Sequence, residues 1–383
     1  MKIRNFIKLS LVGLLLINGA AQASLCGWFK RTFCCGPDLK QEILDNLRIG
    51  NYEALKDKNI VVTCKKAPNS DVPSFGFGDG FLYPIRLCDF LENVCGANSA
   101  VCPPGPLNKF FETCSDLHVI KDISKNNGFI AIDCVDLLNN IPDFHIYECN
   151  KRFLSKNNAL SKEATELAHK MKKSGIIPIL ITRQSSKLPK EHEGNKKFKY
   201  LDFRSMSRGN VQDLVGKFNA ERQKYEESKG IFARLFAAFN FFTTPKQVRF
   251  YNIQFEDQKQ PDIPGVEKPD VIYPQYKERR GAFVNDLVLM KAALDAGGQV
   301  VSVDTAAGNV AVGVPDVNDT RKNIKFLMAK EHNSRWKGKF VKPDGSSVWS
   351  QNIEIVKQKD MGDWSSVCDE LVKEFKGLEG IRG

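Results

Sequence analysis

Apolar runs and amphipathic stretches alternate through the second half of the chain. Residues 162–173 carry apolar side chains at helical spacing, and Gly175 follows where a left-handed helix cap is expected. The apolar run 176–181 comes next and predicts a buried strand. The same order returns later, with a helix predicted over 284–296 and a strand over 299–303.

Strands of this kind, each preceded by a capped helix, indicate a parallel sheet that is covered by helices on both faces. A third apolar run, 129–132, predicts another strand of the same sheet. We therefore predict an α/β fold with one doubly wound, Rossmann-like parallel sheet.

The segment 183–273 interrupts this pattern with a long polar stretch. Helical spacing returns within it over 210–228 and over the strongly apolar stretch 231–242, so we predict a long helical insertion. The second of these helices carries only one cation, which favours packing over the protein rather than binding to a membrane surface. Near the end of the chain, residues 365–375 predict a terminal amphipathic helix.

A stiff, proline-rich stretch over 102–106 separates two regions of different composition. We predict a leader over 1–23, a cysteine-rich N-terminal region over 24–106, an α/β domain over 107–313 and a C-terminal extension over 314–383.

The predicted leader has the layout of a cleavable secretory signal. Basic residues come first, an apolar run over 9–17 follows, and small residues lead to Ala23, so we expect cleavage before Ser24 and export to the periplasm or the medium. The apolar run is shorter than the roughly 20 residues of a membrane-spanning helix. No later stretch is longer and equally apolar, and we expect no stable membrane span.

The formal net charge is +11, but the basic residues are spread along the chain. Binding to nucleic acid usually needs basic residues clustered on one face, with aromatic residues among them. The densest basic stretch, 187–199, is interrupted by acidic residues and glycine. We therefore expect no nucleic-acid partner.

Seven of the eleven cysteines precede residue 106. In an exported chain this density predicts disulfides that stabilise a region with a small core, although the sequence does not give their pairing. The odd total leaves at least one unpaired thiol, and Cys134 is the residue we expect to be unpaired. Zinc is disfavoured because no Cys-x-x-Cys spacing occurs.

Three polar residues stand at the ends of the predicted strands: Asp133, Thr182 and Asp304. Ligands of a doubly wound sheet bind just beyond the carboxyl ends of its strands. Each residue alone would be an ordinary cap of a turn or helix. Together they predict a crevice with two carboxylates and one hydroxyl.

Residues 107–313 resemble the haloacid dehalogenase (HAD) superfamily, and within it an uncharacterised branch of exported bacterial proteins of unknown function. The stretches that carry the resemblance are Phe129–Asp136, Ile179–Arg183, Lys277–Gly281 and Val300–Thr305. The resemblance implies that Asp133 is the nucleophile, Thr182 the phosphate-binding hydroxyl, and Arg280 or Lys277 the conserved cation. It also implies a Mg²⁺ ion held by Asp133 and Asp304.

The match departs from the family at positions that matter for catalysis. Val135 stands where phosphatases of the family carry their general acid, and Thr305 stands where a second aspartate is common. Asp136 could substitute for the missing acid. Alternatively, a shifted register would make Cys134 the nucleophile and Asp136 the acid.

Loss of a general acid lowers a rate by about 10² to 10⁴. The expected function is thus that of an exported, HAD-like hydrolase of small phosphorylated substrates with weak or no activity. The alternative is a non-catalytic exported protein that binds a partner through the cysteine-rich region or the insertion.

Overall fold

The larger of two sheets has the strand order β6-β5-β4-β7-β8-β10-β9, and its strands run parallel except for the pair β9 and β10. The computed structural model describes residues 38–64, 79–123, 128–142, 144, 147, 149, 153–154, 159–182, 208–229, 246–253, 263–278, 283–303, 305–315, 319–330, 346–347, 350–360 and 362–381. The strands of the large sheet are β4 (Ile176–Thr182), β5 (Gln247–Asn252), β6 (Val266–Glu267), β7 (Gln299–Val303), β8 (Ile324–Met328), β9 (Ser346–Ser347) and β10 (Ser350–Lys357).

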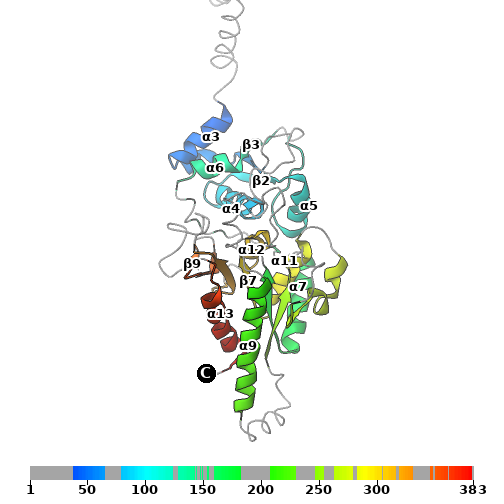
Figure 1. Ribbon diagram of the computed structural model, residues 1–383. Helices are drawn as coiled ribbons and strands as arrows, with labels where there is room; N and C mark the ends of the chain where they lie inside the picture. The colour runs from blue at the N-terminus through cyan, green and yellow to red at the C-terminus, as the bar shows by residue number, and fades with distance from the viewer. Residues whose placement is uncertain are drawn as a thin grey trace, which may run out of the picture.

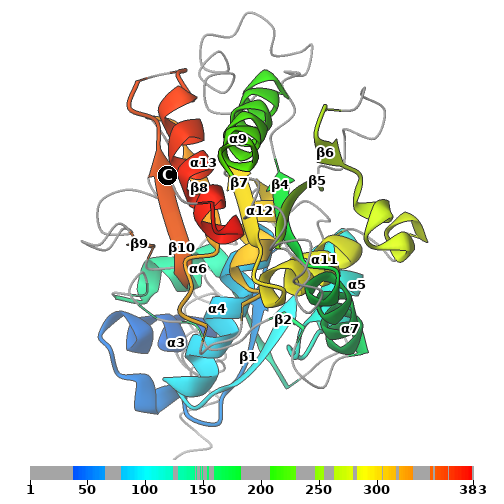
Figure 2. The same cartoon turned by 90° about the horizontal axis from the view of Figure 1, so that it is seen from below.

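Helices cover both faces of the large sheet (Figure 2). On one face lie α7 (Ala159–Lys173), α11 (Val284–Asp295) and α12 (Ala306–Val312), which pack on Leu180 and Val300. On the other face α9 (Arg208–Ser228) and α13 (Ser365–Glu379) lie side by side and pack on Ile179 and Val301. Alternate residues of one strand thus enter different cores, as the period of two of a strand requires. The predicted α/β class with parallel strands is confirmed.

The ends of α7 and α11 follow the sequence pattern closely. Gly175 and Gly297 adopt φ angles of +69° and +89° just after these helices, in the left-handed region that glycine tolerates best. The strands β4 and β7 then begin within two residues. α11 is buried along almost its whole length because it lies between the sheet, α7 and α5 (Gly105–Cys114).

A second, three-stranded parallel sheet has the order β2-β1-β3. Its strands are β1 (Asn59–Thr63), β2 (Asn98–Cys102) and β3 (Ile130–Asp133), and its helices are α3 (Leu39–Arg48), α4 (Asp79–Asn93) and α6 (Cys134–Asn140). The expectation that the strand at 129–132 belongs to the same sheet as those at 176–181 and 299–303 is therefore wrong. β3 pairs with β1 instead, and the small sheet joins strands from both sides of the boundary predicted at residue 106. Figure 1 shows this sheet and α3 at one end of the molecule and α9 at the other.

The segment 183–273 also differs from the expected helical insertion. Its helix α9 agrees with the prediction over 210–228, but β5 and β6 follow and extend the large sheet beside β4. The helix predicted over 231–242 lies outside the described residues. The extension after residue 313 supplies β8, β10 and α13, so it completes the large sheet and one of its covering layers.

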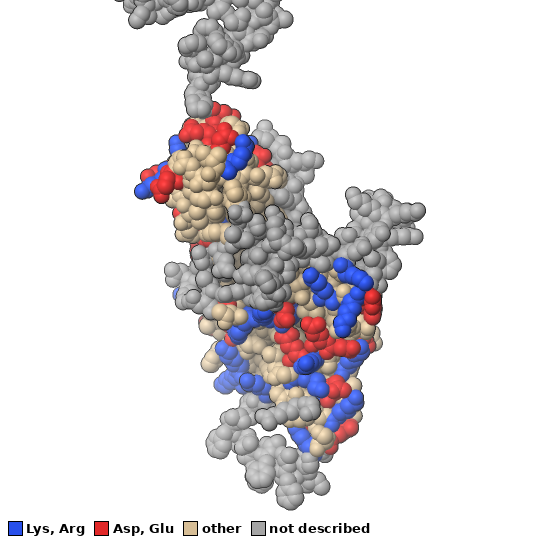
Figure 3. Space-filling model, turned by 90° about the vertical axis from the view of Figure 1, so that its left-hand side faces the viewer, with Lys and Arg blue, Asp and Glu red and all other residues tan. Residues whose placement is uncertain are grey.

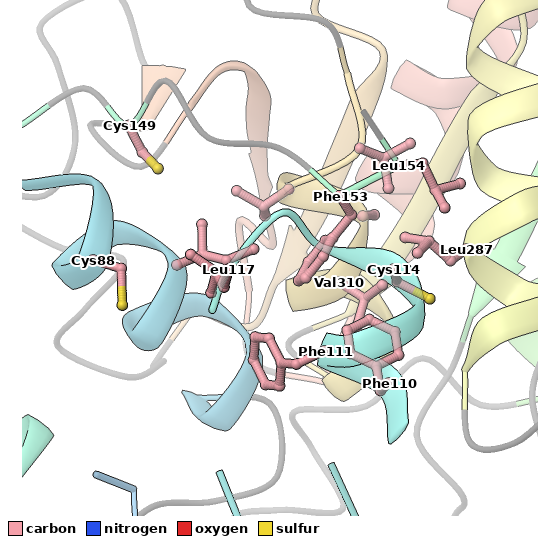
Figure 4. Close-up of a cluster of buried hydrophobic side chains, with 14 of the residues drawn as sticks. Cys88, Phe110, Phe111, Cys114, Leu117, Cys149, Phe153, Leu154, Leu287 and Val310 are labelled. Atoms are coloured by element: carbon pink, nitrogen blue, oxygen red, sulfur yellow. The ribbon is translucent and has the colours of Figure 1, made fainter. Parts of the chain in front are cut away.

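The two sheets share one continuous apolar core. Figure 4 shows Phe110 and Phe111 of α5 gathered with Phe153, beside Val310 of α12 and Leu287 of α11. The ring of Phe153 lies 5.1 Å from that of Phe110, centroid to centroid, and its backbone N–H donates to the carbonyl of Gly313 over 2.7 Å. Phe153 therefore connects the small-sheet region to the large sheet.

None of the helices in the described ranges combines the length and hydropathy needed to cross a membrane. Figure 3 shows one face of the molecule, on which basic and acidic side chains are interspersed over the large-sheet end. This face carries no uniform basic stripe among the described residues.

Candidate functional site

The strand order of the large sheet reverses between β4 and β7. Along the chain β4 comes first, β5 and β6 add on one side of it, and β7, β8 and β10 add on the other. Without the antiparallel edge strand β9, the six parallel strands have the order 3-2-1-4-5-6 of Rossmann-like sheets. After β4 the chain continues to α9 on one face, and after β7 it continues to α12 on the opposite face. Ligands of such sheets bind in the crevice at the carboxyl ends of the two strands where the order reverses.

Three hydroxyl groups meet at this point. Thr182 at the end of β4 pairs in register with Ser302 of β7, and their hydroxyl groups are hydrogen-bonded. The Thr305 hydroxyl lies 3.4 Å from that of Thr182 and 3.2 Å from that of Ser302. It also accepts the N–H of Gly308 over 3.3 Å, which caps α12. Thr182 and Ser302 are buried and Thr305 is half-buried. Of the three hydroxyl groups, that of Thr305 is therefore the most accessible to a ligand.

Gly308 allows α12 to approach β7 this closely. A Cβ atom at position 308 would stand 2.5 Å from the Ser302 hydroxyl oxygen. Sequence reasoning identified Thr182 but missed Ser302 and treated Thr305 only as a departure from the family motif. A serine inside an otherwise apolar buried strand was the available signal, because a buried hydroxyl needs a hydrogen-bond partner.

Asp133 does not join this group of hydroxyls at the edge of the large sheet. It ends β3 in the small sheet, where it pairs in register with Thr63. Its carboxylate accepts the N–H of Val135 over 2.8 Å and caps the first turn of α6. We predicted that Asp133 and Thr182 end strands of the same sheet. This prediction is wrong, because the strand of Asp133 belongs to the small sheet.

The structure supports neither Asp136 as a substitute acid nor Cys134 as an alternative nucleophile. The carboxylate of Asp136 forms an ion pair with Lys40 of α3 over 2.7 Å, which directs it toward the small-sheet helices. Cys134 is fully buried, and burial together with a hydrogen bond to Cys64 raises the pKa of its thiol well above the usual value. A protonated, inaccessible thiol is a poor nucleophile.

The remaining predicted residues divide into two groups. Lys277 lies in the short helix η8 (Pro274–Glu278), where its ammonium is exposed and pairs with Asp270 over 2.7 Å. Arg280 and Asp304 lie outside the described residues. The chain neighbours of position 304, Val303 and Thr305, lie at the carboxyl end of β7.

Asp133 is the last residue of β3 in the small sheet, and Asp304 lies outside the described residues, so the magnesium site predicted from this pair stays a prediction. Among the residues that the structure describes, no group of three or more His, Cys, Asp or Glu side chains is arranged to hold a metal ion. We derive no catalytic step through magnesium.

Comparison with known proteins adds no relative: no protein-family model, no curated protein and no solved structure matches the chain.

Proposed function

We propose that the protein is a non-catalytic binding protein on a Rossmann-like scaffold, with its ligand site at the carboxyl ends of β4 and β7. The reversal of strand order at that point carries the proposal. Thr305 presents a half-buried hydroxyl group there, which can donate a hydrogen bond to a phosphate oxygen, and the buried hydroxyls of Thr182 and Ser302 lie behind it. The ligand class is therefore a small phosphorylated molecule.

We further propose that the chain is exported and is a degenerate member of the HAD superfamily. Export is supported by the leader pattern of residues 1–23. Membership is supported by the stretches at Ile179–Arg183 and Val300–Thr305, whose strands β4 and β7 are neighbours in the large sheet. The degeneracy is supported by Val135 in place of the general acid, and by the capping role of Asp133 in the small sheet.

A weak magnesium-dependent hydrolase is the second candidate. Thr305 lies beside Thr182 and is the chain neighbour of Asp304, which favours this candidate. Mg²⁺ is usually bound by one or two carboxylates together with waters and substrate phosphates. In this candidate Asp304 would hold the ion, and Arg280 or Lys277 would offset the charge of the phosphate.

Substitutions at Thr305 test the proposed binding site without removing the helix cap. Both Asp and Asn cap helices well, so Thr305→Asp and Thr305→Asn should each keep α12 in place. We expect inorganic phosphate, ATP or NAD to bind the wild type and Thr305→Asn. Thr305→Asp should weaken that binding at least about tenfold, because a carboxylate repels the phosphate. Isothermal titration calorimetry measures the affinities.

Two outcomes would contradict the proposal. The binding site is wrong if none of the three probes binds, or if Thr305→Asp binds as tightly as Thr305→Asn. The proposal that the protein is non-catalytic is wrong if the wild type releases phosphate from small phosphate esters with Mg²⁺ and Asp304→Asn does not. That second result would favour the hydrolase.

A further inference from the structure

Two cysteines stand at matching positions on neighbouring strands of the small sheet. β1 and β3 pair in parallel from Ile60 with Ile130 to Thr63 with Asp133. The next residue of each chain segment is Cys64 and Cys134, respectively. Neighbouring strands lie about 4.8 Å apart, and a disulfide needs a Cα separation of roughly 4.4–6.8 Å. The register therefore brings the two backbones to a distance that a disulfide can bridge.

Both side chains enter the same core. Ile60, Val62 and Cys64 alternate toward the core beneath α4, and Ile132 and Cys134 face it from β3 and the start of α6. The intervening residues Val61 and Ala131 pack on the opposite face. Cys64 and Cys134 are 1% and 0% exposed, so water competes little for the space between them. A hydrogen bond between the two thiols also contributes, after burial, to the raised pKa of Cys134.

Two other cysteines among the described residues lie close to this pair, and both are less suitable partners. Cys102 on β2 belongs to the core on the opposite face of the sheet, where its sulfur lies 4.0 Å from the carbonyl oxygen of Lys121. Cys88 belongs to α4, and its sulfur lies 3.7 Å from the carbonyl oxygen of Ala100 on β2. Neither has the register that relates Cys64 to Cys134.

We propose that Cys64 and Cys134 form an intramolecular disulfide when the chain folds in an oxidising compartment. The structure holds both as free thiols. The two thiols give up two protons and two electrons to a disulfide oxidant such as oxidised glutathione, which is reduced to two glutathione thiols, and the S–S bond forms. The bond fastens β1 to β3 at the residue after Asp133. Cys134, which we expected to be unpaired, thus has a partner, and this inference is independent of the proposed ligand site.

Peptide mapping of the full chain tests the disulfide. The protein is produced or refolded with oxidised glutathione, its free thiols are alkylated in denaturant, and the unreduced digest is analysed by mass spectrometry. We expect a linked pair of peptides that contain Cys64 and Cys134. Cys64→Ser should leave Cys134 alkylated, and Cys134→Ser should leave Cys64 alkylated. The matched control Cys368→Ser, at a buried thiol of α13, should keep the link.

Thermal unfolding gives a second readout. Reduction should lower the Tm of the wild type by roughly 5 °C more than it lowers the Tm of either serine variant, since a disulfide stabilises the fold mainly by restricting the unfolded chain. The inference is overturned if Cys64 or Cys134 is linked to Cys88, or if both are alkylated in the oxidised wild type. The peptide map of the wild type shows whether Cys64 and Cys134 are linked even if a serine variant fails to fold.

Discussion

Substitution of Phe153 by alanine is expected to lower the free energy of unfolding by about 3–5 kcal/mol. Phe153 is 2% exposed, and its ring contacts those of Phe110 and Phe111 at centroid distances of 5.1 Å and 6.3 Å. The ring also packs tightly on α12, since a Cβ atom at Gly313 would stand 2.7 Å from it. Removal of the ring leaves a cavity where the small-sheet region meets the large sheet, which the rigid rings around it cannot fill.

Urea denaturation followed by circular dichroism measures this loss. Phe153→Leu should cost clearly less, because it keeps most of the apolar volume. Ile49→Ala removes a large side chain that is 75% exposed, so its effect should stay within about 0.5 kcal/mol. A loss below about 1 kcal/mol in Phe153→Ala would show that the two sheets do not depend on this contact.

Removal of both acidic partners of Lys325 is expected to cost about 3–5 kcal/mol. The Lys325 side chain on β8 is 3% exposed, and its ammonium lies 2.5 Å from a carboxylate oxygen of Glu354 on β10 and 2.6 Å from one of Glu374 on α13. The double variant Glu354→Gln with Glu374→Gln leaves the cation buried without an anion. Desolvation of an unpaired charge is costly, and the double variant should be much less stable than the wild type.

A third substitution separates the charge from the packing. Addition of Lys325→Met to the double variant removes the unpaired cation but keeps an apolar side chain of similar length, so most of the stability should return. The control Asp369→Asn breaks a pair with Lys217 whose side chains are 66% and 36% exposed, and it should change stability by less than about 1 kcal/mol. If the triple variant is as unstable as the double variant, the acids stabilise the sheet through contacts other than charge.

Local patterns predicted local structure well. The helix predicted over 162–173 extends over Ala159–Lys173, and the strand predicted over 299–303 has those bounds in the structure. The terminal helix predicted over 365–375 also forms and continues to Glu379. Apolar periodicity and glycine caps are properties of a few consecutive residues, so the sequence carries them directly.

Pairing between distant strands was not predictable in the same way. The run 129–132 indicates a buried strand, but it does not say which neighbour the strand takes, and β1 was hidden in a region that its cysteines made appear poor in core residues. β5 was missed because Arg249 separates Val248 from the aromatic residues of a short strand inside a polar segment.

The cysteines of the N-terminal region misled for a related reason. Cys64, Cys88 and Cys95 are all buried in the main core, so this region contributes more to the core than its cysteine content suggested. The candidate site was also predicted only in part, because it depends on the pairing of distant strands. Thr182 was visible at a strand end, but its partners Ser302 and Thr305 depend on which strand lies beside β4.

The central claim is that Asp133 caps a helix and does not act as a nucleophile. Chemical trapping of a phosphorylated Asp133 tests this claim most directly. The protein is incubated with acetyl phosphate and Mg²⁺, then treated with borohydride, which reduces an aspartyl phosphate to homoserine, and the peptide that contains residue 133 is identified by mass spectrometry. Because Asp133 caps α6 in the small sheet, we expect residue 133 to be recovered as aspartate. Homoserine at position 133, formed only when Mg²⁺ is present, would contradict the account and restore Asp133 as a nucleophile.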